Sequence, residues 1–138
     1  NAYWATQTDF QIRTVNAWIA LAEGRNDEAL QLMRAATEAE EASDKHPVTP
    51  GNVVPSRELL GEMLMVLNQP QEAQAEFDRS LKRDPNRFRG LYGAARAAQA
   101  AGDRQGALEH YAKLVELVAP RDSERPEVTE AQLFLATR

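Results

Sequence analysis

Apolar residues recur along much of the chain with the spacing of amphipathic helices. Leu60, Leu64 and Leu67 lie at i, i+4 and i+7, and Ala73 and Phe77 follow with a spacing of four. This spacing places the apolar side chains of each segment on one helical face. Glycine, asparagine, aspartate or proline interrupts the pattern at residues 24–26, 68–70 and 102–103. We therefore expect an all-α protein made of helices joined by short breaks.

The same helix–break–helix unit occurs three times. A small residue followed four positions later by methionine or an aromatic residue marks each unit: Ala29 and Met33, Ala73 and Phe77, and Ala107 and Tyr111. Each hairpin has an apolar stripe on both helices and cannot bury both alone, so the hairpins must stack. The sequence predicts one domain over residues 1–138, an α-α superhelix whose repeats cover approximately 10–43, 54–87 and 88–119.

Residues that favour helix ends agree with this division. Asn26 and Asp103 are good N-cap residues, and Pro70 suits a first helical turn. The small residues at positions 29, 73 and 107 are expected where the two helices of a hairpin cross closely.

A final helix is predicted over residues 126–137, after a linker of turn and charged residues. Val128 and Ala131 fall on one side of it, whereas Glu127 and Glu130 fall on the side expected to face water. This helix is interpreted as a C-terminal cap that closes the last repeat.

The first two units are separated by ten more residues than the second and third, which predicts a proline-rich insertion at residues 44–53. Insertions in repeat proteins often lie on the binding side. One hypothesis is that this loop, with His46, Pro47, Thr49 and Pro50, forms a wall of a binding groove. The alternative is that it packs over the junction between the first and second repeats.

The helix before the insertion ends in carboxylates, which oppose the helix dipole. One explanation is a basic partner nearby, and the alternative, which is the more usual one, is that the acidic end is solvated. The candidates for a basic partner are Arg57 and a basic run that consists of Arg79, Lys82, Arg83, Arg87 and Arg89.

Composition narrows the classes of function. The net charge of -5 argues against nucleic-acid binding as the main activity, and no apolar run is long enough to insert into a membrane. The chain has no cysteine, two histidines without a spaced metal-binding partner, and no glycine-rich phosphate loop, so we predict neither an enzyme nor a cofactor or metal site. His110 is interpreted as a solvated residue. An opening without methionine predicts that the chain is a piece of a longer one, and the compartment is left unknown.

The repeat resembles the tetratricopeptide repeat (TPR) family. The residues that carry the resemblance in the second unit are Leu60, Gly61, Leu64, Ala73, Phe77, Ser80 and Pro85, and several of these positions match in the other two units. The family's usual first-helix tryptophan is replaced by Arg13, Arg57 and Leu91. The inserted loop also resembles one found in a set of bacterial TPR proteins that have no assigned activity.

The resemblance implies that the first helix of each repeat lines a concave groove that binds an extended or helical peptide. The residues it places there as partner-binding candidates are Thr14, Trp18, Glu58, Glu62, Arg89, Tyr92 and Arg96, with Gln11, Leu21, Met65 and Gln99 on the same face. Trp18 and Tyr92 are candidate anchors because aromatic side chains recur as binding hot spots; for Trp18 the alternative is core packing.

Arg89 and Arg96 are candidates to bind a carboxylate of the partner. The alternative is that they pair with Glu58 and Glu62 of the neighbouring repeat. TPR proteins that clamp the acidic tail of heat-shock chaperones use five groove positions, and of the residues at those positions here only Arg89 fits, so that function is set aside.

Two functions remain open, with a third that is weaker. The chain is a module that binds a protein or peptide in its groove, or it is a structural segment that stacks on other repeats of its own full-length chain. The second function predicts exposed apolar area around Tyr3, Trp4 and Phe10. The third is an anion or small-ligand site where the basic run meets the inserted loop, which requires several of those arginines to converge.

Overall fold

The computed structural model describes residues 2–43, 54–119 and 124–137. These residues form helices and no strand, as the apolar spacing predicted. The helices are α1 (Ala2–Ala22), α2 (Asn26–Ala42), α3 (Ser56–Val66), α4 (Pro70–Arg83), α5 (Phe88–Ala101), α6 (Arg104–Val118) and α7 (Pro126–Ala136). The four residues His46, Pro47, Thr49 and Pro50 of the predicted loop lie outside the described residues.

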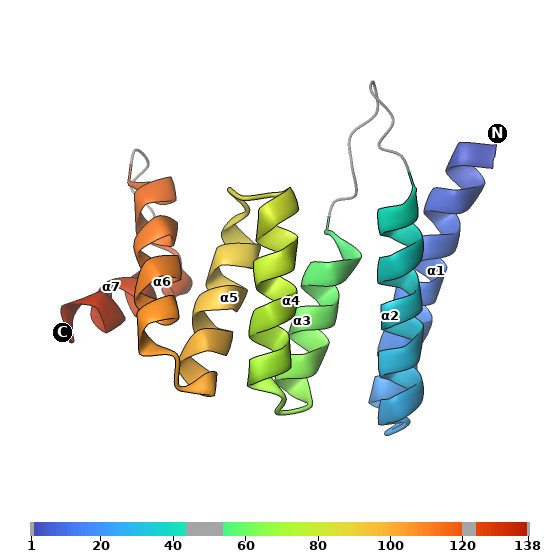
Figure 1. Cartoon of the computed structure of the whole chain (residues 1–138), viewed down its shortest axis with the longest axis horizontal. Helices are drawn as coiled ribbons and strands as arrows, with labels where there is room; N and C mark the ends of the chain where they lie inside the picture. Colours follow the sequence, from blue (N-terminus) through green and yellow to red (C-terminus); the bar gives the residue numbers. More distant parts are fainter. Residues whose placement is uncertain (1, 44–53, 120–123, 138) are drawn as a thin grey trace.

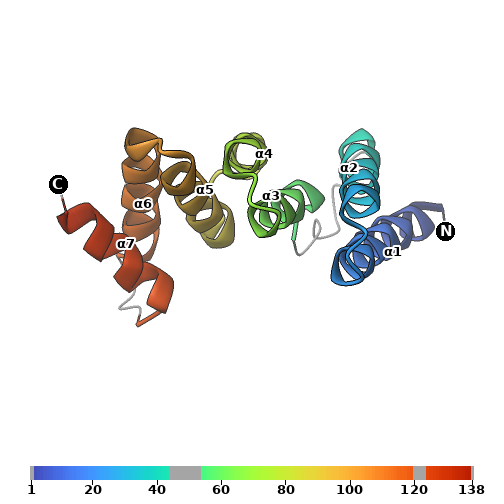
Figure 2. The same cartoon turned by 90° about the horizontal axis from the view of Figure 1, so that it is seen from below.

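The helices pair into three hairpins that stack side by side, with the chain termini at opposite ends of the array (Figure 1). Helices α1, α3 and α5 form one layer and α2, α4 and α6 form the other (Figure 2). The array bends so that α1, α3, α5 and α7 lie on its inner side (Figure 2). This is the helical-hairpin solenoid that the repeat pattern predicted.

One turn geometry recurs in all three hairpins. Gly24, Asn68 and Gly102 have positive φ angles of 77°, 58° and 83°. Each is followed by a residue whose backbone N–H donates to a carbonyl five positions earlier, as Asp103 does to Ala98. Such left-handed turns satisfy carbonyls that a helix end leaves unpaired, and they allow the second helix to start two residues later.

This turn also explains which of the predicted caps form. Asp103 follows the left-handed residue and is the N-cap of α6, where its side chain accepts a hydrogen bond from the Gly106 N–H at 2.9 Å. The prediction for Asn26 was wrong, because the equivalent position after Gly24 is Arg25, and Asn26 already lies inside α2. Pro70 occupies the first turn of α4, as predicted.

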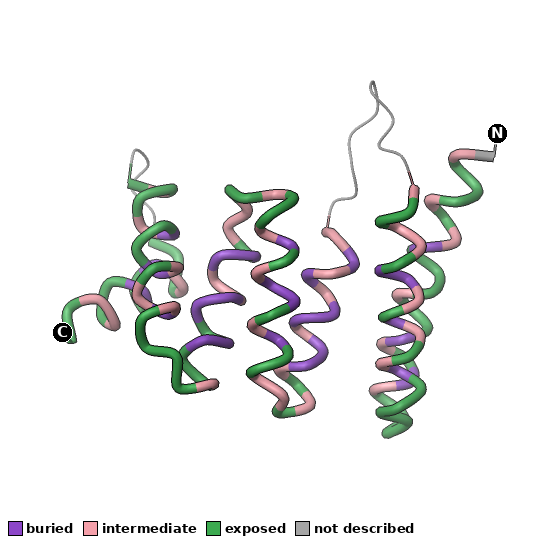
Figure 3. Tube along the Cα trace, in the orientation of Figure 1, coloured by how far each residue is buried: buried purple, intermediate pink, exposed green. Residues whose placement is uncertain are grey.

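The core follows the repeat pattern. Ala29, Ala73 and Ala107 are fully buried, and so are the larger residues four positions after them, namely Met33, Phe77 and Tyr111. Buried positions run as a stripe along each hairpin and are densest in the middle of the array, on α3 and α5 (Figure 3).

The ring of Phe77 is held between two glycines of neighbouring hairpins. A Cβ atom on Gly93 of α5 would lie 2.4 Å from the ring, and one on Gly61 of α3 would lie 2.9 Å from it. Only glycine leaves room at these two positions for the ring in its observed place. Helix α4 therefore packs against both α3 and α5 through one aromatic side chain.

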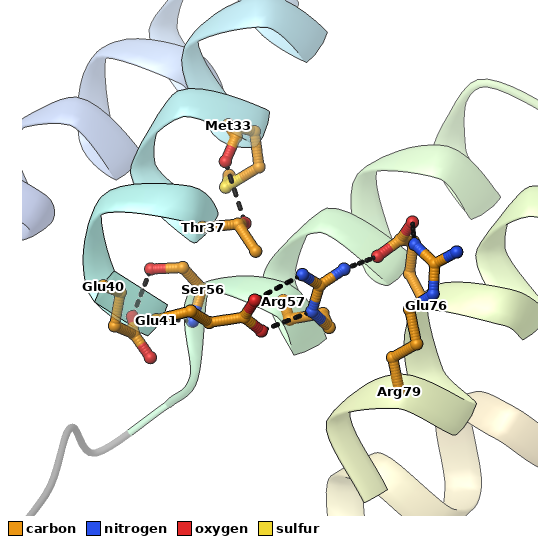
Figure 4. A network of polar contacts seen from close by, with 8 residues as sticks. All are labelled: Met33, Thr37, Glu40, Glu41, Ser56, Arg57, Glu76 and Arg79. Atoms are coloured by element: carbon orange, nitrogen blue, oxygen red, sulfur yellow. Dashed lines mark hydrogen bonds and ion pairs between the residues drawn. The ribbon is translucent and has the colours of Figure 1, made fainter. Parts of the chain in front are cut away.

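The junction between α2 and α3 adds polar contacts to the apolar cluster that contains Met33 and Leu60 (Figure 4). The Glu40 carboxylate accepts hydrogen bonds from the backbone N–H of Ser56, at 3.0 Å, and from its hydroxyl, so α2 caps the start of α3. Arg57 of α3 contacts both carboxylate oxygens of Glu41, at 2.5 and 2.6 Å, and also pairs with Glu76 of α4. We call this set of contacts the polar brace.

The polar brace places a basic residue beside the acidic end of α2. Of the basic candidates, Arg57 supplies the direct contact. Its hydrogen bonds to Glu41, supported by the charges of Arg83 and Arg79, hold the pKa of that carboxyl below its ordinary value. Arg57 replaces the tryptophan expected at this repeat position and is mostly covered from solvent.

Candidate functional site: a groove between α3, α5 and α7

The inner side of the array contains a hollow of about 740 Å³. We call it the α3–α5–α7 groove. It is lined by Glu62, Met65, Val66, Phe77, Phe88, Arg89, Tyr92, Gly93, Arg96, Arg125 and Glu127. Four predicted site residues, Glu62, Arg89, Tyr92 and Arg96, are therefore brought together. They meet because residues three or four apart share one face of a helix, here on α3 and α5.

Arg89 is already engaged within the protein. One of its terminal nitrogens lies 2.6 Å from an oxygen of Glu62, on the neighbouring repeat. This is the pairing that the sequence offered as an alternative to partner binding. Arg89 is more than half exposed and Glu62 is partly exposed, so the pair is worth about 1 kcal/mol and a partner can replace it.

Tyr92 stands between the groove and α7. Its hydroxyl donates to Glu130 at 2.7 Å, and the buried Tyr111 hydroxyl lies 3.1 Å from the other oxygen of the same carboxylate. Partial burial, followed by this contact with Glu130, raises the pKa of Tyr92 to about 12. Burial also raises the pKa of Tyr111. Glu130 is exposed, as expected, but its carboxylate also joins α7 to α5 and α6.

Two guanidinium groups of the groove lie over aromatic rings. The Arg96 guanidinium is 5.6 Å from the centroid of the Tyr92 ring, and that of Arg125 is 4.8 Å from the centroid of the Phe88 ring. Neither group forms an ion pair with a carboxylate in the described ranges. Arg96 thus does not pair with Glu58 or Glu62, and its N–H edges remain available.

Glu58 does not line the groove, which corrects the sequence-based placement. It is 0% exposed, and one of its oxygens accepts a hydrogen bond from Arg87 at 2.8 Å. The cause lies on α5, where Gly90 has no side chain and its backbone can approach the Glu58 carboxylate closely. The combination of Arg87 with Gly90 three positions later is the signal that distinguishes the buried Glu58 from the partly exposed Glu62.

Thr14 and Trp18 lie in the first repeat, apart from the groove. Thr14 lines a smaller hollow of about 310 Å³ between α1, the end of α2 and the start of α3, and its hydroxyl donates to the Phe10 carbonyl at 2.9 Å. Trp18 is half-buried and packs against the core cluster that contains Met33 and Leu60. Trp18 therefore contacts the core with part of its surface, and its role as a groove anchor stays a prediction.

The basic run does not converge on one point. Arg79 pairs with Glu76, Arg87 with Glu58 and Arg89 with Glu62, so three of its members contact carboxylates at different places. This arrangement does not support the anion site considered from the sequence. In the described part of the chain, acidic residues and histidines also form no cluster suited to a metal ion. His110, interpreted as solvated, is instead mostly covered and lies 3.0 Å from Asp78.

Sequence reasoning missed the contribution of the last helix to the groove. Arg125 and Glu127 stand at the start of α7 and line the groove together with Phe88. The apolar positions Val128 and Ala131 are buried as predicted, and Arg125 at the start of α7 lies over the Phe88 ring of α5. The one available signal was the basic residue directly before the helix-starting proline.

The fold is similar to solved structures over nearly the whole chain. PcrH from Pseudomonas aeruginosa, in complex with the chaperone binding region of PopD, matches with a TM-score of 0.72 and 16% identity, covering 95% of this chain and 91% of that chain. A TPR-like protein from Chlorobium tepidum matches with a TM-score of 0.65 and 21% identity, covering 97% of this chain and 96% of that chain. The TPR domain of P58(IPK) matches with a TM-score of 0.67 and 17% identity, covering 99% of this chain and 36% of that one.

No protein-family model and no curated protein matches the sequence. Within the described ranges, no helix is both long and apolar enough to span a bilayer. The likeness to solved structures, the repeated turns and the buried positions of the repeat together show that the chain has the tetratricopeptide repeat fold.

Proposed function

We propose that this chain is a non-catalytic module that binds a segment of a partner protein in the α3–α5–α7 groove. The observation that carries the proposal is the hollow of about 740 Å³, in which apolar side chains from α3 and α5 lie beside charged side chains from α5 and α7. Binding sites commonly combine an apolar surface with a few polar groups that fix orientation. PcrH, which shares the fold, was crystallised with segments of PopD and PopB, and this supports a peptide as the ligand class.

A charge placed in the groove tests the proposal. Val66 lines the groove with 65% of its surface exposed, so Val66→Lys should fold normally while placing an ammonium group against the ligand. Leu117→Lys is the matched control, because Leu117 is an exposed apolar residue of α6 outside the groove. Proteins captured from a lysate of the source cell by the full chain should be lost with Val66→Lys and kept with Leu117→Lys. Equal capture by all three proteins would contradict groove binding.

The role of the inserted loop stays a prediction and needs its own variant. Replacing residues 45–53 by a short Gly-Ser link removes His46, Pro47, Thr49 and Pro50 together with the residues beside them. If the loop is a wall of the binding site, this variant should fold, as judged by circular dichroism, and lose the captured partner. Unchanged capture would leave the loop as a packing feature.

A second candidate function is structural, and α1 favours it. Trp4, Ile12, Val15 and Ile19 are each about half exposed and follow one face of α1, opposite the face that carries the buried Phe10. A further helix, including one from another repeat of the full-length chain, would cover this face. Tyr3 is partly buried and Phe10 is 3% exposed, so of the three residues expected here from the sequence only Trp4 presents a large exposed surface. Substituting Ile12 and Ile19 by lysine should leave groove binding intact and abolish any stacking seen by light scattering.

A further inference from the structure

The α3–α5–α7 groove has an excess of positive charge once its internal ion pair is counted. Three arginines and two glutamates line it, and Arg89 and Glu62 neutralise each other at 2.6 Å. Arg96, Arg125 and Glu127 remain, which leaves one net positive charge in the groove of a chain whose net charge is -5. The groove therefore differs in sign from the protein as a whole.

The two remaining guanidinium groups are held in place by aromatic rings, Arg96 over Tyr92 and Arg125 over Phe88. A guanidinium stacked on a ring keeps its N–H edges free, and these edges match the two oxygens of a carboxylate. The supporting rings are themselves fixed, because the Tyr92 hydroxyl donates to Glu130 at 2.7 Å and Phe88 packs against the core cluster around Leu91. Holding the arginines in this way reduces the entropy lost when a carboxylate binds.

We propose that the α5–α7 end of the groove recognises an acidic side chain of the partner segment, bound by Arg96 and Arg125, next to an apolar side chain that contacts Val66 and Met65. The inference rests on the proposed function, since it names the chemistry of the segment that the groove takes. Of the two arginines that the sequence offered for a partner carboxylate, Arg89 is occupied by Glu62, and Arg125 at the start of α7 takes its place beside Arg96.

Glu127 supplies the internal counter-charge. It lines the same hollow but pairs with neither arginine in the structure. A partner carboxylate meets the repulsion of Glu127 as well as the attraction of the two arginines, so the Glu127→Gln variant should bind an acidic segment more tightly. The same variant would bind a basic segment more weakly. The sign of the change in affinity therefore separates the two kinds of partner.

The first experiment selects binders from a library of short random peptides, using the full chain and its variants as bait. The chain should enrich peptides in which aspartate or glutamate adjoins an apolar residue. The double variant Arg96→Gln, Arg125→Gln should lose the acidic enrichment. Arg104→Gln is the matched control, because Arg104 also stacks on an aromatic ring, 5.3 Å from the centroid of Phe134, but lies outside the groove. It should retain the enrichment.

The second experiment measures the affinity of one enriched peptide by fluorescence anisotropy. Each single arginine variant should weaken binding by roughly three- to tenfold, the range of an exposed charge-assisted hydrogen bond. Raising the salt concentration should weaken the wild type more than the double variant. Circular dichroism of each variant verifies that the fold is kept.

Four results would overturn the inference. Enriched peptides without an acidic excess, or an excess that persists in the double variant, would remove the acidic preference while leaving groove binding in place. If no peptide is enriched at all, both the acidic preference and the proposed function are contradicted. Displacement of the peptide by single-stranded oligothymidine, but not by an acidic competitor peptide, would assign the arginines to phosphate.

Discussion

The junctions α2–α3 and α4–α5 both join one hairpin to the next and both contain part of one apolar cluster, yet their further contacts differ. At α4–α5 the Phe77 ring lies against Gly93, and its other side meets Gly61. At α2–α3 the polar brace joins the helices through ion pairs and a side-chain cap (Figure 4). The extra ten residues of the sequence fall at the junction that is held by the polar brace.

The different contacts at the two junctions indicate how a repeat array tolerates an irregular unit. Apolar packing requires helices to approach within van der Waals contact, so a change of one methyl group matters. Long arginine and glutamate side chains span a less regular junction and still satisfy each other. The same repeat position holds Arg57 in the second unit and the buried Leu91 in the third, so the polar and apolar solutions occupy equivalent places.

The largest effect is expected from Gly93→Ala at the apolar junction. The new Cβ would lie 2.4 Å from the Phe77 ring, which Gly61 confines on the other side. Relieving such overpacking typically costs about 1–3 kcal/mol, and we expect the upper part of that range in urea denaturation. In a Phe77→Leu background the same substitution should cost much less, since a smaller side chain leaves room. Equal costs in both backgrounds would show that the ring does not set the spacing.

A smaller loss is expected from Arg57→Met in the polar brace. The substitution leaves Glu76, whose side chain is 8% exposed, without its Arg57 partner, although Arg79 still contacts it at 3.2 Å. Losing one partner of a mostly covered pair should lower the free energy of unfolding by about 2 kcal/mol.

Arg13→Met is the matched control for this variant. Arg13 holds the same position in the first repeat, but its pair with Asp9 is exposed, so the loss should stay below about 1 kcal/mol. Similar losses for the two variants would mean that the brace adds no more than a surface ion pair.

The architecture could be predicted from the sequence because each unit carries its own signals. Ala73 and Phe77 recur in register, and the positive-φ residues Gly24, Asn68 and Gly102 stand at the same place in every hairpin. Local spacing determines which residues face the core when each repeat contacts only its neighbours. The failure at Asn26 was a shift by one position within such a turn.

The groove could be predicted only in part. Glu62, Arg89, Tyr92 and Arg96 come together because they share faces on α3 and α5. The role of α7 could not be read from periodicity, since a period gives the buried face of a helix but not the direction in which it docks. Glu58 was misplaced for a related reason, because its burial depends on the close approach of another repeat at Gly90.

Alkaline pH should weaken the attachment of α7 to α5. The folded state raises the pKa of Tyr92 to about 12 from an ordinary value of 10.0. Its contribution is complete below pH 10 and is lost as pH rises toward 12, because the unfolded chain releases this proton first. Tyr92→Phe should lower stability by about 1 kcal/mol at neutral pH and make the alkaline decline shallower. A decline of unchanged steepness in Tyr92→Phe would assign it to other groups.

The smallest effect is expected from Glu41→Gln. The pH dependence of its stability, compared with that of the wild type, reports on the polar brace. Arg57 holds the pKa of the Glu41 carboxyl below its ordinary value of 4.5. A lowered pKa means that the ion pair stabilises the fold above the ordinary value and that this stabilisation is lost as pH falls through the folded-state pKa. The wild type should therefore exceed Glu41→Gln in stability at neutral pH and converge with it in acid. Because Glu41 is partly exposed, added salt should reduce the neutral-pH difference. A difference that persists at low pH would place the effect of Glu41 in packing, and the two junctions would then be more alike than their chemistry indicates.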